Sequence, residues 1–146
     1  MGAWGVGPFE NDLACDWVYG LEDDAREKGL LRKRAAPFAR IDRTLGAALT
    51  ATYELWSDAE ETLAAAEAVA AARGRPCPDL PEEFEPWLPV AKAQGVPPGL
   101  VTRAIEAARK ARETSELRSL WEKTSDNYIG WLATVDDLLA RLQGPG

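Results

Sequence analysis

Residues 61–74 read ETLAAAEAVAAARG, an alanine-rich run that ends in a glycine. Alanine has the highest intrinsic helix propensity, and glycine is common just after the last residue of a helix. Ser57 and Glu60 have the spacing of a capping box, in which each side chain bonds the other residue's backbone N–H. Because alanine side chains let neighbouring helices approach closely, the run predicts a helix that packs at the centre of the fold.

Apolar residues on both sides of this run recur every three or four positions, which is the period of an amphipathic helix. A first helix is expected to begin at Asn11 or Asp12 and to be weakened or ended by Gly20. Further helices are expected to begin near Pro37 and after Pro97 and Pro98. The last helix has the most regular apolar face, formed by Tyr128, Leu132, Val135, Leu139 and Leu142.

A proline-rich stretch from about residue 75 to residue 89 connects two of these helices. A linker between separate domains would lack large apolar anchors, whereas this stretch contains Phe84 and Trp87, which are expected to hold it against the body. The sequence therefore predicts a single all-α domain over residues 1–146, with about five or six helices and essentially no sheet.

The chain has 146 residues and a net charge of −7, which limits its partners. Nonspecific nucleic-acid binding needs a dominant basic surface, so no nucleic acid is expected. The sequence has no apolar run of transmembrane length and no signal-peptide pattern at its start, so a cytoplasmic protein with no membrane partner is expected. The basic residues Arg32, Lys33 and Arg34 are either a solvated face or the docking site of an acidic protein partner.

Cys15 and Cys77 are the only cysteines in the sequence, and in a reducing cytosol both thiols are expected to be free. Cys15 lies within the expected first helix, and its thiol is expected to be buried. Cys77 lies between two prolines and is expected to be exposed, where a reactive thiol is an open alternative.

The sequence contains no histidine. This excludes the usual Ser-His-Asp and Cys-His nucleophile pairs, histidine-containing zinc sites and the Glu-x-x-His helices of di-iron bundles. The phosphate-binding patterns GxxxxGK[ST] and GxGxxG after a strand are also missing. We therefore expect no metal and no cofactor, and carboxylates are the remaining candidates for chemistry.

Glu67 is the most unusual carboxylate, because it interrupts the alanine run at the edge of the face expected to be buried. It is a solvated side chain, a structural acceptor for an arginine or for loop N–H groups, or a catalytic acid kept neutral by burial. The structural role, which we expect, implies donors that lower its pKa. The catalytic role implies a raised pKa.

The first seventeen residues, MGAWGVGPFENDLACDW, combine glycines with large apolar side chains. Trp4, Phe9 and Trp17 are expected to be anchors that dock this arm on the helices. For Trp4, part of an aromatic cage for a ligand is the alternative.

Polar residues in the same motif mark the start of the first helix: Glu10, Asn11, Asp12 and Asp16. Asn11 and Asp12 are equally compatible with helix capping and with a site. Asp12 and Asp16 are four residues apart, so they lie on one side of the helix, where they are solvated or share a cation with Glu10.

This opening resembles that of the bacterial family of domains of unknown function numbered four-two-five-nine, which reads approximately M-G-x-W-G-x-G-x-F-[DE]-N-D-x-A-x-D. The resemblance continues through LAAAEAVAAARGRP and SELRSLWE, and so spans nearly the whole chain. It implies a small, mostly helical bacterial protein with no established activity, and it assigns no catalytic residue.

The sequence favours a noncatalytic interaction or regulatory protein, such as an immunity-type protein that neutralises a partner. The missing histidine, the missing nucleotide motifs and the segregated charge support this class. The alternative is a carboxylate-based enzyme or a metal-dependent binder of a small ligand, using acids of the N-terminal motif or Glu67.

Overall fold

The structure is a computed structural model that describes residues 7, 9–10, 12–27, 37–50, 59–78, 80–114 and 125–144. These residues form helices and no strand, which confirms the all-α prediction. The helices are α1 (Asp12–Glu27), α2 (Ala39–Thr50), α3 (Ala59–Ala72), the 3₁₀ turn η2 (Glu82–Phe84), α4 (Leu88–Gln94), α5 (Pro98–Thr114) and α7 (Ser125–Gln143). In the described part of the chain, no helix is both long enough and apolar enough to cross a membrane.

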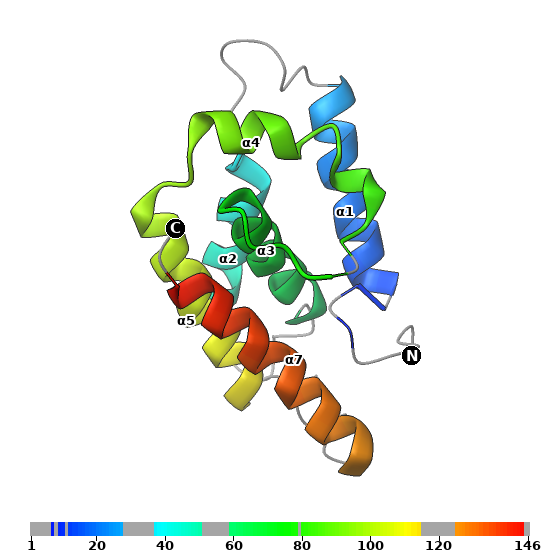
Figure 1. Cartoon of the computed structure of the whole chain (residues 1–146), viewed down its shortest axis with the longest axis vertical. Helices are drawn as coiled ribbons and strands as arrows, with labels where there is room; N and C mark the ends of the chain where they lie inside the picture. The colour runs from blue at the N-terminus through cyan, green and yellow to red at the C-terminus, as the bar shows by residue number, and fades with distance from the viewer. Residues whose placement is uncertain are drawn as a thin grey trace.

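Helix α3 lies at the centre of the fold and contacts α1, α2, α4, α5 and α7 (Figure 1). All eleven positions from 62 to 72 are buried, so no side of this part of the helix faces solvent. The predicted central position is therefore confirmed, and alanine side chains give five elements room around one axis.

The alanine helix ends as its sequence predicts. Gly74 adopts φ +86°, and its N–H bonds the carbonyl of Ala71 at 2.9 Å, while the N–H of Arg75 bonds that of Ala70 at 2.9 Å. This pair of bonds is the Schellman motif, which requires a residue that tolerates positive φ. Ser57 of the predicted capping box lies outside the described residues.

Helix α1 begins at Asp12 as predicted, but it does not end at Gly20, which was one of the two expected effects of this glycine. The helix continues to Glu27 because Leu21, 1% exposed, extends the buried face of Ala14, Trp17 and Val18. A Cβ on Gly20 would lie 2.7 Å from the Arg40 guanidinium, so glycine makes room for a side chain of α2.

The proline-rich connection is shorter than predicted, because α4 already begins at Leu88 with Pro89 in its first turn. Phe84 and Trp87 are buried as expected. Edge-on ring contacts link four aromatic residues. The ring centroids are 5.5 Å apart for Phe9 and Phe84, 5.9 Å for Phe84 and Trp87, and 6.1 Å for Trp87 and Phe38. This aromatic chain ties the N-terminal segment and the start of α2 to the connection.

The remaining helices depart from the sequence prediction by small shifts. Helix α2 begins at Ala39 rather than at Pro37, and Pro37 and Phe38 form the turn before it. Helix α5 begins at Pro98, which the sequence analysis placed just before the helix. In α7 the buried face is formed by Trp131, Val135, Leu138 and Leu142, whereas the predicted Leu132 and Leu139 are only partly buried. The side chain of Tyr128 lies outside the described residues.

Candidate functional site

Glu67 lies in the middle of α3 and has no exposed surface. The sequence placed it at the edge of the buried face, but α3 is covered on every side here, so the solvated alternative is wrong. An ionised carboxylate without partners would cost many kcal/mol in such surroundings, so the groups that face it decide its state.

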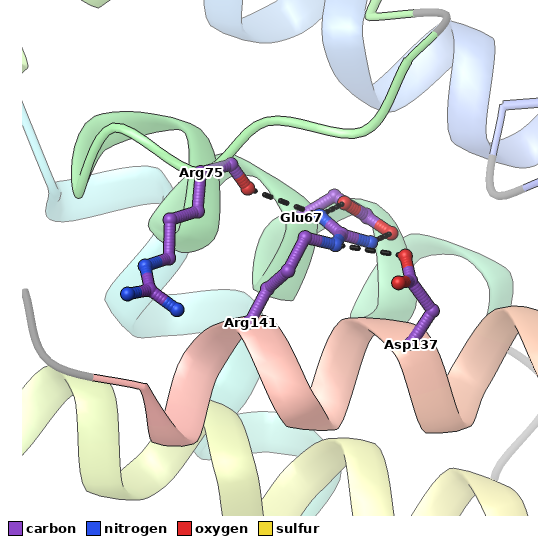
Figure 2. A network of polar contacts seen from close by, with 4 residues as sticks. All are labelled: Glu67, Arg75, Asp137 and Arg141. Carbon is purple, nitrogen blue, oxygen red and sulfur yellow. Dashed lines mark hydrogen bonds and ion pairs between the residues drawn. The ribbon is translucent and has the colours of Figure 1, made fainter.

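The partner of Glu67 is Arg141, which reaches it from α7 (Figure 2). Arg141 Nη1 donates to Glu67 Oε1 at 2.7 Å, and Nη2 donates to Oε2 at 2.9 Å. Both carboxylate oxygens are therefore engaged in a two-pronged ion pair, the strongest geometry for these groups.

The rest of the Arg141 guanidinium is also engaged. Nη1 donates a second hydrogen bond to the carbonyl oxygen of Arg75 at 3.1 Å, and Nε donates to Asp137 Oδ2 at 2.8 Å. Figure 2 shows the Arg75 side chain turned away from the pair, so Arg75 contributes its backbone oxygen only. Arg141 thereby joins α7, α3 and the loop that follows α3.

Burial raises the pKa of Glu67 above its ordinary value, and the hydrogen bond and charge of Arg141 offset only part of this effect. Burial also works against the charge of Arg141, but the hydrogen bonds and negative charges of Glu67 and Asp137 together outweigh burial and raise the pKa of Arg141. The expected lowering of the Glu67 pKa was therefore wrong. The sequence argument counted donors but placed the carboxylate at an edge, where desolvation is small.

Two other arginines hold α7 in place. Arg73 donates to the carbonyl oxygens of Leu142 and of Gly144, the latter at 2.9 Å, and so satisfies the C-terminal end of the helix. Arg112 of α5 pairs with Asp136 at 2.6 Å and 3.3 Å. Polar contacts thus fix α7 at three points, and the face that carries Arg141 and Leu138 turns toward α3.

The N-terminal motif lies elsewhere in the structure. Phe9 is buried, Glu10 and Asp16 are exposed, and Glu10 Oε1 accepts a hydrogen bond from the Gly7 N–H at 3.0 Å. Trp17 is buried and its Nε1 donates to Thr44 Oγ1 at 2.9 Å. Trp4, Asn11 and the side chain of Asp12 lie outside the described residues, as do Arg32, Lys33 and Arg34.

No group of three His, Cys, Asp or Glu residues able to hold a metal ion occurs among the described residues. Neither cysteine is in a disulfide, but the exposures expected for the two were exchanged. Cys77 is 6% exposed, whereas Cys15 is partly exposed and its thiol donates to the Phe9 carbonyl at 3.3 Å.

A groove that the sequence did not indicate opens where α2 and α5 begin, with a volume of about 410 Å³. Its apolar lining comes from Pro37, Phe38, Pro97 and Leu100. Asp42 of α2 and Arg103 of α5 form an ion pair within it, and both side chains are nearly half exposed. No sequence signal could have found this pair, because nothing local links two residues on different helices.

A family model described as Domain of unknown function (DUF4259) matches residues 2–134, in agreement with the resemblance at the N-terminus. No curated protein matches the chain, and neither does any solved structure.

Proposed function

Since this chain belongs to that family of unknown function, we propose that it is a noncatalytic interaction or regulatory protein of the bacterial cytoplasm. Neutralisation of a partner protein, as immunity proteins do, is the form of this function that we favour. The partner is a protein rather than a nucleic acid or a membrane, in keeping with the net charge of −7.

The engagement of Glu67 is the observation that carries this proposal. Glu67 was one of the catalytic candidates in the sequence, yet its two oxygens bind Arg141 and its side chain has no contact with solvent. A catalytic acid must reach the proton that it transfers. The raised pKa of Glu67 follows from its burial, because the free energy lost when two charges leave water often exceeds the attraction between them.

The exposed groups of the described residues support the same reading. Glu10 bonds its own turn through the Gly7 N–H, and Asp16 is solvated on the outer side of α1. Large apolar side chains that face solvent occur on two helices, with Tyr19 of α1 51% exposed and Ile129 of α7 66% exposed. Tyrosine is enriched where partner proteins bind most tightly.

Photo-crosslinking in the source cell tests the proposal. A photoreactive phenylalanine analogue replaces one exposed residue at a time, at Tyr19, Gln94 and Ile129, which lie on or beside α1, α4 and α7. We expect one protein to be captured from one of these faces, and the complex to re-form from purified components. The same analogue at Ala140, exposed on α7, measures random capture.

The Glu67→Gln variant separates the interaction function from the alternative in which this carboxylate does chemistry. If Glu67 has a structural role only, a folded Glu67→Gln variant binds the captured partner as the wild type does. Equal capture from every position, with no complex between purified components, would contradict the interaction proposal.

A further inference from the structure

The groove at the start of α2 and α5 has a preformed apolar floor. Phe38 is 8% exposed and Leu100 is 3% exposed, and both belong to the core, so their exposed edges are held by packing behind them. Pro37 and Pro97 form the adjoining walls. Proline fixes its own backbone φ, so these walls need little ordering when a ligand binds.

Contacts outside the groove fix the two helices that form it. Trp87 Nε1 donates to the carbonyl of Pro37 at 2.6 Å, behind the groove wall. At the other end of α2, Lys110 of α5 donates to the carbonyl of Ala48 at 2.7 Å. The groove is therefore a feature of the folded core rather than a gap between independent parts.

The groove contains N–H donors of Arg103 that no described residue uses. Asp42 is its one acid, and it already pairs with Arg103. A guanidinium carries five N–H donors. The ion pair with Asp42 is the one polar contact of the Arg103 side chain within the described chain. Asp42 offsets part of the positive charge of Arg103, and the first turn of α5, at the positive end of the helix dipole, contains no acidic residue.

A carboxylate beside an apolar group matches this combination of donors and apolar floor. A partly exposed Arg–Asp pair contributes little to stability, so Arg103 can accept a second carboxylate at little cost. The groove is open along one side, whereas a site for a small molecule encloses most of its ligand. An occupant carried on a larger partner would gain further contacts around the rim.

We infer that this groove binds a segment of a partner protein in which an acidic residue neighbours a large apolar residue, with the acid on Arg103 and the apolar side chain over Phe38 and Leu100. The inference rests on the proposed interaction function and names the surface and the chemistry of the partner.

Peptide display tests the inference. A random dodecapeptide library is selected on the full-length protein, and the enriched peptides are synthesised with blocked ends. We expect Asp or Glu within two positions of Leu, Ile or Phe. Backbone amide signals of Phe38 and Leu100 should shift in NMR spectra on titration.

Matched variants on one helix locate the carboxylate contact. Arg103→Gln should weaken peptide binding at least tenfold, whereas Arg109→Gln, an exposed arginine of the same helix, should change it less than twofold. Circular dichroism confirms that both variants fold. Replacing the acid of the peptide by its amide should cause a similar loss on the wild type and no further loss on Arg103→Gln.

Three results would overturn the inference: no enrichment of acidic residues, equal binding by Arg103→Gln, or amide shifts away from the groove. 4-Methylpentanoate provides the small-molecule arm. If it causes the groove shifts and the blocked peptides do not, the occupant is a free carboxylic acid and the partner-segment inference is wrong. If crosslinked capture in cells persists in Arg103→Gln, the interaction function stands and the groove is not its surface.

Discussion

The indole N–H of Trp87 donates a 2.6 Å hydrogen bond to the carbonyl oxygen of Pro37, a residue 50 positions earlier in the chain. Trp87 has no exposed surface, so neither group has water as a substitute partner. This single bond connects the start of α4 to the turn before α2, and it supports the wall of the groove.

Removal of the indole donor should therefore be costly. Trp87→Phe keeps an aromatic ring but leaves the Pro37 carbonyl without its partner, and an unsatisfied buried acceptor costs about 1–3 kcal/mol. Urea unfolding measures the loss. Trp17→Phe is the control and should lose less, because Thr44 keeps its hydrogen bond to the Arg40 carbonyl. An equal loss in the two variants would contradict this interpretation.

Loss of Arg141 should destabilise the protein far more than loss of an exposed arginine. Arg141→Met leaves Glu67 buried and unpaired, which costs about 3–5 kcal/mol at pH 7. Arg112→Met breaks a pair whose side chains are 33% and 53% exposed and should cost at most about 1 kcal/mol. The double variant Glu67→Met with Arg141→Met should regain most of the stability, and its failure to do so would argue against the ion pair as the cause.

The raised pKa of Glu67 predicts the direction of a pH effect. The native state keeps the proton of Glu67 to a higher pH than the unfolded state, whose pKa is near 4.5. The contribution of Glu67 to the free energy of unfolding is therefore largest below that value and falls as pH rises through the folded pKa. Glu67→Gln cannot ionise, so its stability relative to the wild type should rise from pH 4 to pH 7.

Urea melts of both proteins at the two pH values measure this change. Glu106→Gln, at an exposed position of α5, is the control and should show no comparable trend. A relative stability of Glu67→Gln that falls between pH 4 and pH 7 would mean that the folded pKa is lowered instead.

The alanine surface of α3 should not tolerate larger side chains. Ala66 has no exposed surface. Ala66→Leu forces its neighbours apart and should lower the free energy of unfolding by about 1–3 kcal/mol, the usual range for overpacking a core. Ala140→Leu, at an exposed position of α7, should change stability by less than about 0.5 kcal/mol. Similar unfolding midpoints for both variants would show that α3 has room around it.

The two thiols should differ in reactivity. Cys77 is buried, so iodoacetamide should label it more slowly than the partly exposed Cys15 in the native protein. Peptide mass spectrometry after timed labelling gives the two rates, and labelling in urea should make them similar. Faster labelling of Cys77 in the native state would place it on an accessible surface.

Much of the fold follows from local sequence signals. The alanine run predicted the position of α3, and Gly74 predicted its end, because both effects depend on residues that are close in the chain. The end of α1 was not predicted correctly from Gly20, because the burial of Leu21 in the core outweighs the roughly 1 kcal/mol that a glycine costs inside a helix.

The site depends on contacts that no local pattern contains. Glu67 was identified as unusual, but its partner Arg141 was not, because the two are 74 positions apart. The same pair explains the shift in α7. Once Arg141 faces α3, Leu138 shares its side of the helix, and Leu139 turns partly outward.

The 74 positions between Glu67 and Arg141 in the chain also have a consequence for biosynthesis. Translation proceeds at roughly 5–20 residues per second, so Arg141 is added to the nascent chain about 4–15 s after Glu67. During this interval the carboxylate has no guanidinium to bind, and enclosing the alanine helix would isolate an uncompensated charge. The face of α3 that α7 covers in the folded protein therefore stays uncovered until α7 has been synthesised.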